Sequence, residues 1–528
     1  QLFAYDLTSD GDVLKGRSLG PLVPGAKATD CRAMCVASDG TVWAGVAATF
    51  EGRGQFLHVV RWRPADSAPR DMGPVAIRNP DYVTTIKADG KTKPWHHGVY
   101  RLPDGKLLPR YTIMGICAAR DGTVYLTTLY PFTLHAIQIP KVAGITTEYR
   151  HNSHADMFFT RLLATDTLDG RGRTPSLQLA SIYTDQLPAN DISREFGRKH
   201  AVPTHDSIKD ALTLGTGQLA VDGVLLIAEH GKYPESNTGQ FVFPKRRMFR
   251  EVVETFRDAG RVVPVFHDKH LADNWADAKW IYDQARRLQI PMMAGSSLPV
   301  TWRYPPVDVR RGARLKQVVA VSYHRLDAYG FHALEMVQSL AERRAGGETG
   351  VRAVQCFTGD DVWEAEKRGV YDRRLLDEAL SRLKQRPLPA GKKIEQLVRE
   401  PVLFVVDYRD GLRANIFTLN HAVVEWAAAW RYADSGESES TLFWTQELRP
   451  FMHFTYQLMG IEQMMQTGKP VWPVERTLLT SGTLDALLVS KRDGGKRLDT
   501  PWLDVRYQTD WDWCQPPPPP PGRPISKQ

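Results

Sequence analysis

Three short segments in the middle of the chain are dense in side chains that titrate or donate hydrogen bonds. Each follows an apolar run, and together they contain glutamate, histidine, aspartate, lysine and serine. A lysine beside apolar walls can have its pKa lowered by desolvation and can donate to a substrate hydroxyl or alkoxide. A histidine is a natural general base near neutral pH. The sequence therefore indicates acid–base chemistry at these segments, which are residues 228–233, 267–270 and 294–297.

The elements around these segments alternate between strands and helices from residue 141 to residue 304. This alternation predicts a Rossmann-like α/β domain with a parallel, doubly wound sheet. Ligands of such sheets bind beyond the carboxyl ends of the strands, so we expect the three segments to form one polar cleft. The predicted strands are residues 142–145, 177–183, 221–227, 261–266 and 291–295, and the predicted helices are residues 153–163, 190–200, 245–259 and 272–288.

The order of elements changes after about residue 305. Longer strands and amphipathic helices predict an α+β domain with a large, mostly antiparallel sheet over residues 305–510. We expect strands at residues 315–323, 402–408 and 412–419, and helices at residues 328–344, 454–467 and 474–491. Residues 511–528 hold a proline run and are predicted to form a solvated, Pro-rich tail.

The first 140 residues form a β-rich region of a different texture. Asp-Gly pairs at residues 10–11, 39–40, 104–105 and 121–122 are hairpin signals, and residues 35–43 and 117–125 are near copies. Such repetition is typical of propeller blades, although a ring needs at least about four of them. Blades could precede Gln1, the strands could pair with another chain, or the region could be a smaller accessory sheet.

Two motifs give the chain from about residue 141 to residue 508 a family resemblance. Asp268-Lys269-His270 precedes a helix, as does the Glu-Lys-Pro signature of one family, and Gly330-Phe-His332-Ala-Leu-Glu335 is similar to its Gly-x-His-x-x-Asp motif. The chain thus resembles the sugar oxidoreductases of glucose–fructose oxidoreductase, inositol dehydrogenase and the rhizopine-catabolism proteins (Gfo/Idh/MocA). The resemblance implies that Lys269 and His332 are the catalytic pair. It also implies a large open sheet through which members pair, and hence a homo-oligomer.

The resemblance also implies NAD or NADP as cofactor, although the glycine fingerprint is absent. Thr146, Glu148 and His151 stand approximately where the family has glycines, so side chains crowd the turn and Glu148 adds negative charge. A helix N-terminus near His154 would still attract anions, and Asp185 lies where a ribose-binding carboxylate is expected. The candidate cofactor-binding residues are Thr146, Thr147, His154, Asp185 and Asp268.

The candidate substrate-binding residues are Glu229, His230, Tyr323 and Glu335. The first three would hold sugar hydroxyls. Glu335 lies three residues from His332 on a predicted helix, so the two share a face and Glu335 could orient the imidazole. His267 and His270 add metal-ligand types, but no fixed spacing such as His-Glu-x-x-His occurs, so no metal site is predicted.

Composition limits the classes of partner. The chain has 528 residues and a net charge of +8, with basic and acidic residues interspersed, which does not favour a nucleic-acid-binding protein. No run approaches about 18 apolar residues, so no membrane span is predicted. A signal peptide is absent or was removed before Gln1, and the compartment stays open. Five cysteines without a Cys-x-x-Cys pair favour neither a disulfide framework nor a cysteine zinc site.

The sequence leaves two classes of function open. The first is an enzyme acting on a carbohydrate or polyol, in which His332 takes the hydroxyl proton and Lys269 polarises the oxygen during hydride transfer. If the cofactor has been lost, the same pair could run proton transfer beside a carbonyl, as in β-elimination or epimerisation. The second class is a non-catalytic protein that binds a glycan or a partner through a degenerate Rossmann scaffold.

Overall fold

The computed structural model describes two compact units of the chain. One comprises residues 1–140, 161–178 and 196–201, and the other comprises residues 141–160, 179–195 and 202–528. The residues that the structure describes are 2–7, 13–37, 40–51, 54–63, 68–76, 85–88, 91–94, 99–101, 107–109, 113–119, 123–128, 133–137, 139–168, 173–389 and 391–518.

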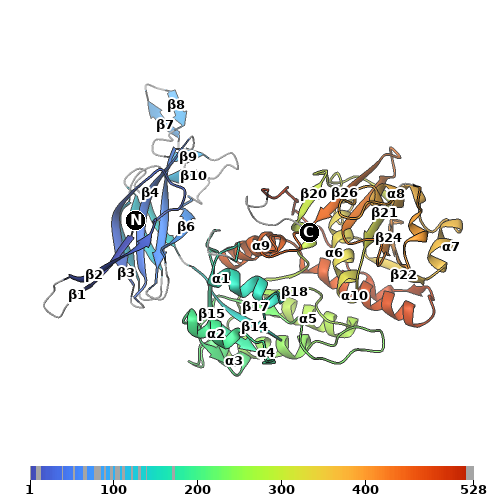
Figure 1. Ribbon diagram of the computed structural model, residues 1–528, viewed down its shortest axis with the longest axis horizontal. Coiled ribbons are helices and arrows are strands. Elements are labelled where there is room, and N and C mark those ends of the chain that lie inside the picture. The colour runs from blue at the N-terminus through green and yellow to red at the C-terminus, as the bar shows by residue number, and fades with distance from the viewer. Residues whose placement is uncertain are drawn as a thin grey trace. The chain divides into compact units, whose positions relative to one another are not determined.

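The first unit is built from antiparallel strands, drawn in blue and cyan in Figure 1. Its largest sheet has four strands, and a second sheet has three. The four-stranded sheet contains β3 (Ala28–Val36), β4 (Val42–Phe50), β5 (Gly54–Trp62) and β6 (Arg70–Pro74), and the three-stranded sheet contains β11 (Ile113–Ala118), β12 (Val124–Thr128) and β13 (Thr133–Ile137). Three strand pairs complete the unit: β1 (Leu2–Leu7) with β2 (Val13–Gly20), β7 (Thr85–Ala88) with β8 (Lys91–Pro94), and β9 (Val99–Arg101) with β10 (Leu107–Pro109).

The two near-copy segments occupy equivalent places in two hairpins. Cys35 lies opposite Trp43 in the β3–β4 pair, and Cys117 lies opposite Tyr125 in the β11–β12 pair. Equivalent backbone hydrogen bonds of 2.8 Å close the two hairpins. The amide of Ala37 donates to the carbonyl of Thr41, and the amide of Ala119 donates to the carbonyl of Thr123. The repeated sequence therefore encodes a repeated hairpin.

A propeller arrangement of this unit is not confirmed. The two larger sheets share one apolar cluster, in which Trp43, Leu57 and Val59 pack with Val124 and Leu126. The four-stranded and three-stranded sheets are therefore packed on each other through this cluster. The Asp-Gly turns at residues 10–11, 104–105 and 121–122, and Asp39 of the remaining one, lie outside the described residues.

The second unit begins with the predicted Rossmann-like sheet. Its six strands follow the order β16-β15-β14-β17-β18-β19, which in sequence order is 3-2-1-4-5-6. This is the strand order of dinucleotide-binding folds, and it confirms the predicted doubly wound α/β architecture. The strands are β14 (Lys141–Thr146), β15 (Gln178–Thr184), β16 (Thr204–His205), β17 (Gly223–Ile227), β18 (Val265–Asp268) and β19 (Met292–Gly295).

Helix α4 (Lys245–Ala259) shows why the predicted elements form. Its apolar residues recur at intervals of three and four, so that one stripe from Met248 to Phe256 is buried against the sheet. The helix ends where Gly260 adopts a left-handed φ of 60° and its amide bonds back to the last turn. The other helices of the second unit's Rossmann-like part include α3 (Ile208–Thr213) and α5 (Trp275–Arg287), while α2 (Ser193–Lys199) is divided between the two units. A π-helix, η2 (Asp156–Thr160), and the short α1 (Arg161–Leu163), which belongs to the first unit, replace the helix predicted at residues 153–163.

The α+β part of the second unit contains an eight-stranded sheet of order β20-β26-β25-β21-β24-β23-β22-β27. The sheet is mixed, because β21 and β24 are parallel while their other neighbours are antiparallel. Its strands are β20 (Trp302–Tyr304), β21 (Leu315–Ser322), β22 (Val351–Thr358), β23 (Val402–Tyr408), β24 (Arg413–Thr418), β25 (Trp426–Tyr432), β26 (Ser438–Trp444) and β27 (Leu498–Asp499).

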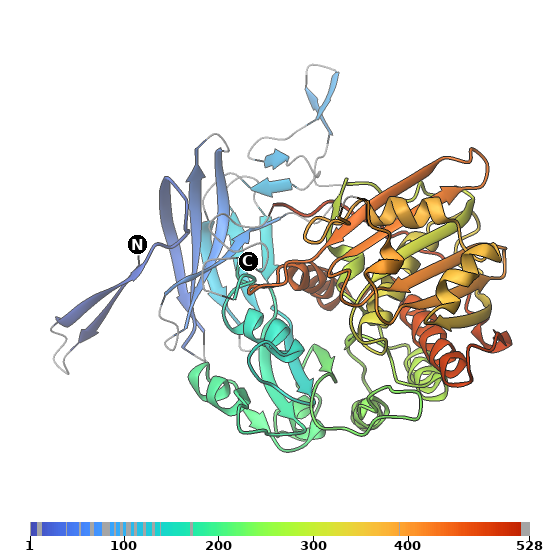
Figure 2. The ribbon, with the colours of Figure 1, turned by 45° about the vertical axis from the view of Figure 1, so that its right-hand side comes forward.

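Helices cover both faces of this sheet. Alternate strand residues such as Val318 and Phe404 pack with α6 (Tyr329–Ala341) and α10 (Val474–Arg492). Their neighbours Val319 and Leu403 face the other side and pack with α7 (Asp361–Lys367) and α8 (Arg373–Leu380), which Figure 2 shows against the sheet. The open face implied by the family resemblance is therefore covered in the described part of this chain. A homo-oligomer stays a prediction.

The beginning of the Pro-rich segment is docked rather than solvated. Trp513 donates to the carbonyl of Thr301 over 2.8 Å, and Pro516 is buried. The carbonyl of Pro517 accepts from the indole of Trp302 and from the hydroxyl of Tyr456, which lies on α9 (His453–Thr467). The prediction of a solvated tail thus fails at Trp513 and Pro516, while residues 512, 514, 515, 517 and 518 are exposed and residues 519–528 lie outside the described part of the chain. Of the helices that the structure describes, none is both long and apolar enough to span a membrane.

Candidate functional site

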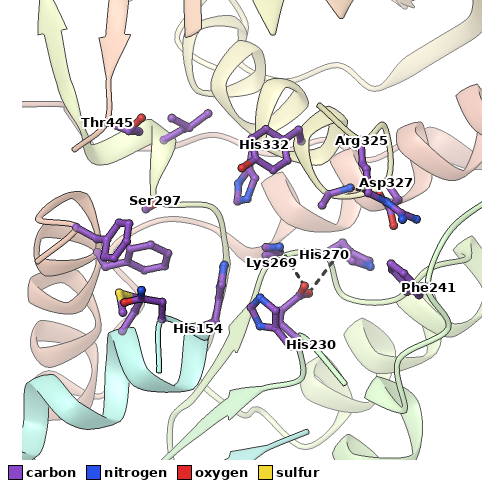
Figure 3. Close-up of a pocket in the computed structure, with 18 of the residues that line it drawn as sticks. His154, His230, Phe241, Lys269, His270, Ser297, Arg325, Asp327, His332 and Thr445 are labelled. Carbon is purple, nitrogen blue, oxygen red and sulfur yellow. Dashed lines mark hydrogen bonds and ion pairs between the residues drawn. The ribbon is translucent and has the colours of Figure 1, made fainter. Parts of the chain in front are cut away.

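A cavity of about 450 Å³ lies within the second unit and is lined by both of its parts (Figure 3). Ionisable and aromatic side chains line it. The Rossmann-like part contributes residues that include Arg150, Asn152, His154, Glu229, His230, Lys269, His270 and Ser297, and the later part contributes residues that include Arg325, Asp327, Tyr329, His332, Trp426, Glu447, His453 and Phe454.

The three predicted polar segments meet at this cavity because they leave successive strands at one edge of the sheet. Each strand end carries a left-handed residue: His230 after β17 (φ 72°), Lys269 after β18 (φ 58°) and Gly295 at the end of β19 (φ 114°). Side chains in this conformation cost roughly 1–2 kcal/mol, and such strain collects at functional sites. At Gly295 a Cβ would lie 2.4 Å from an oxygen of Glu335, so the close approach there requires glycine.

Lys269 is held as a cation by its carboxylate neighbour. Its Nζ lies 3.1 Å from Oε2 of Glu229, whose other oxygen accepts from Lys245 over 2.8 Å. Burial alone would raise the pKa of Glu229, but Lys245 and Lys269 hold it well below the usual range. Burial opposes the charge of Lys269 too, yet Glu229 and Asp268 outweigh it and raise the pKa of Lys269. The lysine thus acts as a hydrogen-bond donor, and the expected lowering of its pKa by desolvation is outweighed.

His332 enters the cavity from the first turn of α6 and points toward Lys269 (Figure 3). Its Nδ1 lies 2.6 Å from Oγ of Ser296, and that hydroxyl oxygen accepts from the amide of Leu298 over 3.1 Å. Burial, reinforced by the charge of Lys269, lowers the pKa of His332 well below its usual value. The imidazole is therefore neutral at neutral pH, with one nitrogen fixed by Ser296 and the other left for a ligand.

Glu335 does not orient His332 directly. It is fully buried, and its carboxylate accepts from the hydroxyls of Thr480 and Thr477 over 2.7 and 3.0 Å and from the amide of Ser296 over 3.3 Å. Burial raises the pKa of Glu335 despite these bonds. The glutamate is directed toward α10, so its link to His332 runs through Ser296. It is not among the residues that line the cavity.

Two further candidates lie at the cavity wall. Nδ1 of His154 is 2.6 Å from Oδ2 of Asp268, a carboxylate that is 1% exposed. His230 packs beside His154 with ring centroids 5.4 Å apart, and burial lowers the pKa of His230 to about 3. Tyr323 is one layer behind, because it packs on the rings of Tyr329 and Trp426 and is not among the lining residues.

The other candidate cofactor ligands are already partnered by the protein. The hydroxyl of Thr146 donates to the carbonyl of Ile227 over 2.9 Å, and that of Thr147 donates to the carbonyl of Glu229 over 2.8 Å. Asp185 accepts from the hydroxyls of Tyr183 and Tyr233 over 2.8 and 2.7 Å, and also from Arg247. These three residues do not line the cavity.

The turn after β14 does not fit a dinucleotide bound in the manner of the glycine fingerprint. The buried carboxylate of Asp156 accepts from the amide of Asn152 over 2.8 Å and from Arg449 over 2.6 Å. Oγ of Ser153 accepts from the amides of Arg150 and Asp156. The amides that a diphosphate would use are thus bonded within the chain, and an internal carboxylate stands where an anion would bind.

Comparisons with known proteins were made at three levels. No protein-family model and no curated protein matches the chain. Similar solved structures include GenD2 from gentamicin A biosynthesis in complex with NAD, at 12% identity and a TM-score of 0.45, covering 69% of this chain and 97% of that chain. A second similar structure is scyllo-inositol dehydrogenase from Lactobacillus casei with NAD(H) and scyllo-inositol, at 9% identity and a TM-score of 0.43, covering 69% of this chain and 99% of that chain. Structural neighbours of this chain are Gfo/Idh/MocA-type sugar oxidoreductases. Aldose-aldose oxidoreductase from Caulobacter crescentus with glycerol is similar at 13% identity and a TM-score of 0.39, covering 69% of this chain and 100% of that chain.

Several features of the site carry no signal in the sequence. Ser296 lies behind the cavity wall in a segment that was singled out, but its bond to the lining residue His332 depends on tertiary structure. Trp426 opens an ordinary apolar strand, and Tyr329 precedes the motif that contains His332. No group of three or more potential metal ligands is arranged around one point in the described part of the chain.

Proposed function

We propose that this protein is an enzyme that acts on an oxidised carbohydrate or polyol by moving protons at a carbon beside a carbonyl group. One observation carries the proposal. The ammonium group of Lys269 lies on the Rossmann-like side of the cavity, and the neutral imidazole of His332 lies on the α+β side. At the turn that would bind a dinucleotide, the carboxylate of Asp156 already accepts a hydrogen bond from the amide of Asn152. Proton transfer needs no bound redox partner.

The reaction would proceed in two balanced steps. His332 takes the proton from the carbon beside the carbonyl, and the electron pair of that C–H bond moves onto the carbonyl oxygen. The ammonium of Lys269 donates to the resulting enolate, whose negative charge it stabilises. The enolate then collapses, either by taking a proton back at carbon or by expelling an oxygen from the next carbon, which leaves with the proton that His332 received.

The walls of the cavity suit a neutral, hydroxyl-rich ligand. Its cationic residues have carboxylate partners nearby: Lys269 with Glu229, and Arg325 with Asp327 at 3.3 Å. Tyr329 and Trp426 are stacked at 5.4 Å and offer an apolar surface to one face of a sugar ring. A volume of about 450 Å³ is within the range of small-molecule sites.

Hydride transfer with NAD or NADP is the second candidate, and the strand order 3-2-1-4-5-6 favours it. It would require the bonds of Asp156 and Ser153 at the turn to be replaced by bonds to a diphosphate. A purely glycan-binding role is the third, and it predicts ligand binding without any exchange of carbon-bound hydrogen.

Solvent exchange separates these functions. The protein is incubated in D₂O without added nucleotide with scyllo-inosose, D-fructose or D-glucuronate, and deuterium at the carbon beside the carbonyl is followed by NMR. Proton transfer predicts enzyme-dependent incorporation with at least one of the three compounds. Absence of incorporation with all three contradicts the proposal.

A further inference from the structure

A second imidazole faces the cavity from the Rossmann-like part. His154 follows the turn after β14, its side chain is 14% exposed, and it lines the cavity together with Lys269 and His332. Phe454 packs edge-on against its ring at 5.0 Å and limits the ring's movement. Figure 3 shows His154 and His332 on different walls, one below and one above Lys269 in that view.

The partner of His154 determines which of its nitrogens is available. Asp268 is 1% exposed, and its Oδ2 lies 2.6 Å from Nδ1. A carboxylate only accepts hydrogen bonds, so Nδ1 carries a proton and the lone pair of the neutral ring is on Nε2. The aspartate also stabilises the imidazolium that forms when Nε2 takes a proton, as in other Asp–His pairs. Ser296, the partner of His332, can either donate or accept, so His332 can present a proton or a lone pair.

We propose that His154 is a second catalytic proton-transfer group, with Asp268 as its positioning residue, so that the enzyme inverts the configuration of the carbon beside the carbonyl. The inference rests on the proposed proton-transfer function. In the form of the enzyme in which His154 holds a proton on Nε2 as an imidazolium paired with Asp268, neutral His332 takes the proton from one face of the carbon, and the C–H electron pair moves to the carbonyl oxygen held by Lys269. Nε2 of His154 then gives its proton to the other face as the enolate electrons return to carbon, which leaves His154 neutral and His332 protonated. In the reverse direction the two histidines exchange roles.

The inference differs from the general function in its stereochemistry. One base acting alone removes and returns the proton on the same face, which gives exchange without inversion. Two bases on different walls give inversion, because the proton returns from the side opposite to the one it left. His154 is therefore required for the inverted product, while exchange at the face served by His332 does not need it.

The experiment compares the wild-type protein with His154→Gln and His332→Gln in D₂O, using scyllo-inosose, D-fructose and D-glucuronate. NMR reports deuterium incorporation and the appearance of the inverted epimer separately. We expect His154→Gln to lower formation of the inverted epimer by at least about 100-fold, the scale of lost acid–base catalysis, while deuterium still enters the starting compound. If the His154→Gln protein forms the inverted epimer at a rate within threefold of the wild-type rate, the inference is overturned, while the proposed function still stands. No exchange by the wild-type protein overturns both.

Asp268→Asn provides a second test if His154→Gln does not fold. Loss of the carboxylate removes the partner of the His154 imidazolium without removing the imidazole, so inversion should fall by at least about tenfold while deuterium still enters the starting compound. An unchanged rate of inversion in this variant, or an equal fall in inversion and exchange, contradicts the positioning role. Thermal unfolding of each variant identifies those that retain the native fold.

Discussion

Nζ of Lys269 and Oε2 of Glu229 lie 3.1 Å apart at the ends of two adjacent parallel strands. The glutamate also accepts from the buried Lys245, so a single carboxylate balances two ammonium groups. Glu229 thereby raises the pKa of Lys269 against the effect of burial and keeps it charged. The site consequently contains a permanent donor for a carbonyl or enolate oxygen, beside the neutral imidazole of His332.

Replacing Glu229 should therefore destabilise the protein strongly. Glu229→Gln leaves the ammonium groups of Lys245 and Lys269 buried without their carboxylate, and breaking a buried pair in this way costs about 3–5 kcal/mol. The free energy of unfolding in urea measures the loss. Asp258→Asn is the matched control, since its pair with Lys209 is exposed and screened by solvent, so its loss should change the free energy of unfolding little. Equal effects of the two substitutions would contradict the role given to Glu229.

Acid should unfold the protein through its buried histidines. Burial lowers the pKa of His230 and His267 to about 3, and lowers those of His270 and His332 well below normal. In the unfolded chain each would take up a proton near pH 6.5, so the unfolded state binds more protons than the native state below that pH. Stability should fall as the pH decreases from about 6.5 toward 3, by up to roughly 1.4 kcal/mol per pH unit for each histidine.

Urea unfolding at several pH values between 7.5 and 4.5 measures this slope. His267→Asn should reduce the slope by about one proton, because the imidazole that it removes is fully buried. His421→Asn is the control for replacing a histidine that is exposed rather than buried. A stability that does not depend on pH in this window would mean that the buried imidazoles titrate normally.

The backbone at Gly295 should not tolerate a side chain. Gly295→Ala places a Cβ 2.4 Å from Oε2 of Glu335 and 2.7 Å from the hydroxyl of Thr477, at a φ of 114°. Overpacking together with backbone strain should cost at least about 2 kcal/mol. Gly312→Ala has a φ of 78° and no atom within 4 Å of the new Cβ, so it isolates the backbone cost of about 1 kcal/mol. Equal losses in urea unfolding would show that the site relaxes around the added carbon.

Local patterns predicted the elements of the Rossmann-like part well, and tertiary contacts explain what they missed. The stripe from Met248 to Phe256 and the stop at Gly260 specify α4 within the sequence itself. The hydrogen bond between Ser296 and His332 joins residues 36 positions apart, and no local sequence pattern predicts it. The direction of the pKa shift of Lys269 likewise depends on Glu229, which follows a different strand.

Tertiary contacts also explain the two features, the turn after β14 and the covered sheet face, that differ from what the family resemblance implied. The absent glycines showed that the turn after β14 was unusual, but not that Asp156 would take the amide of Asn152. The helices α7 and α8 cover a sheet face that the resemblance implied to be open, because apolar residues such as Leu375 continue its core. Both features depend on contacts formed in the folded protein, which local sequence patterns do not reveal.

The protein should not bind a free nicotinamide dinucleotide tightly. The amides at the turn are satisfied internally, and the nearby cations Arg449 and Arg150 are already paired with Asp156 and Glu148, so they are not free to hold a diphosphate. Calorimetric titration with NAD and with NADP should give no heat of binding up to about 1 mM, a limit of about −4 kcal/mol. Denatured protein should also release no nicotinamide. Saturable binding below about 0.1 mM, or released nicotinamide, would mean that the turn rearranges and that hydride transfer is the better account.

The most direct test of the whole account is solvent exchange by Lys269→Met in the absence of nucleotide. Methionine retains the length of the side chain and removes the ammonium group, while Lys245 still balances Glu229. We predict that deuterium incorporation beside the carbonyl of the active compound falls by at least about 100-fold, as for the loss of one oxyanion donor, and that Lys209→Met, at an exposed lysine, leaves it unchanged. Incorporation by folded Lys269→Met within threefold of the wild-type rate would contradict the account.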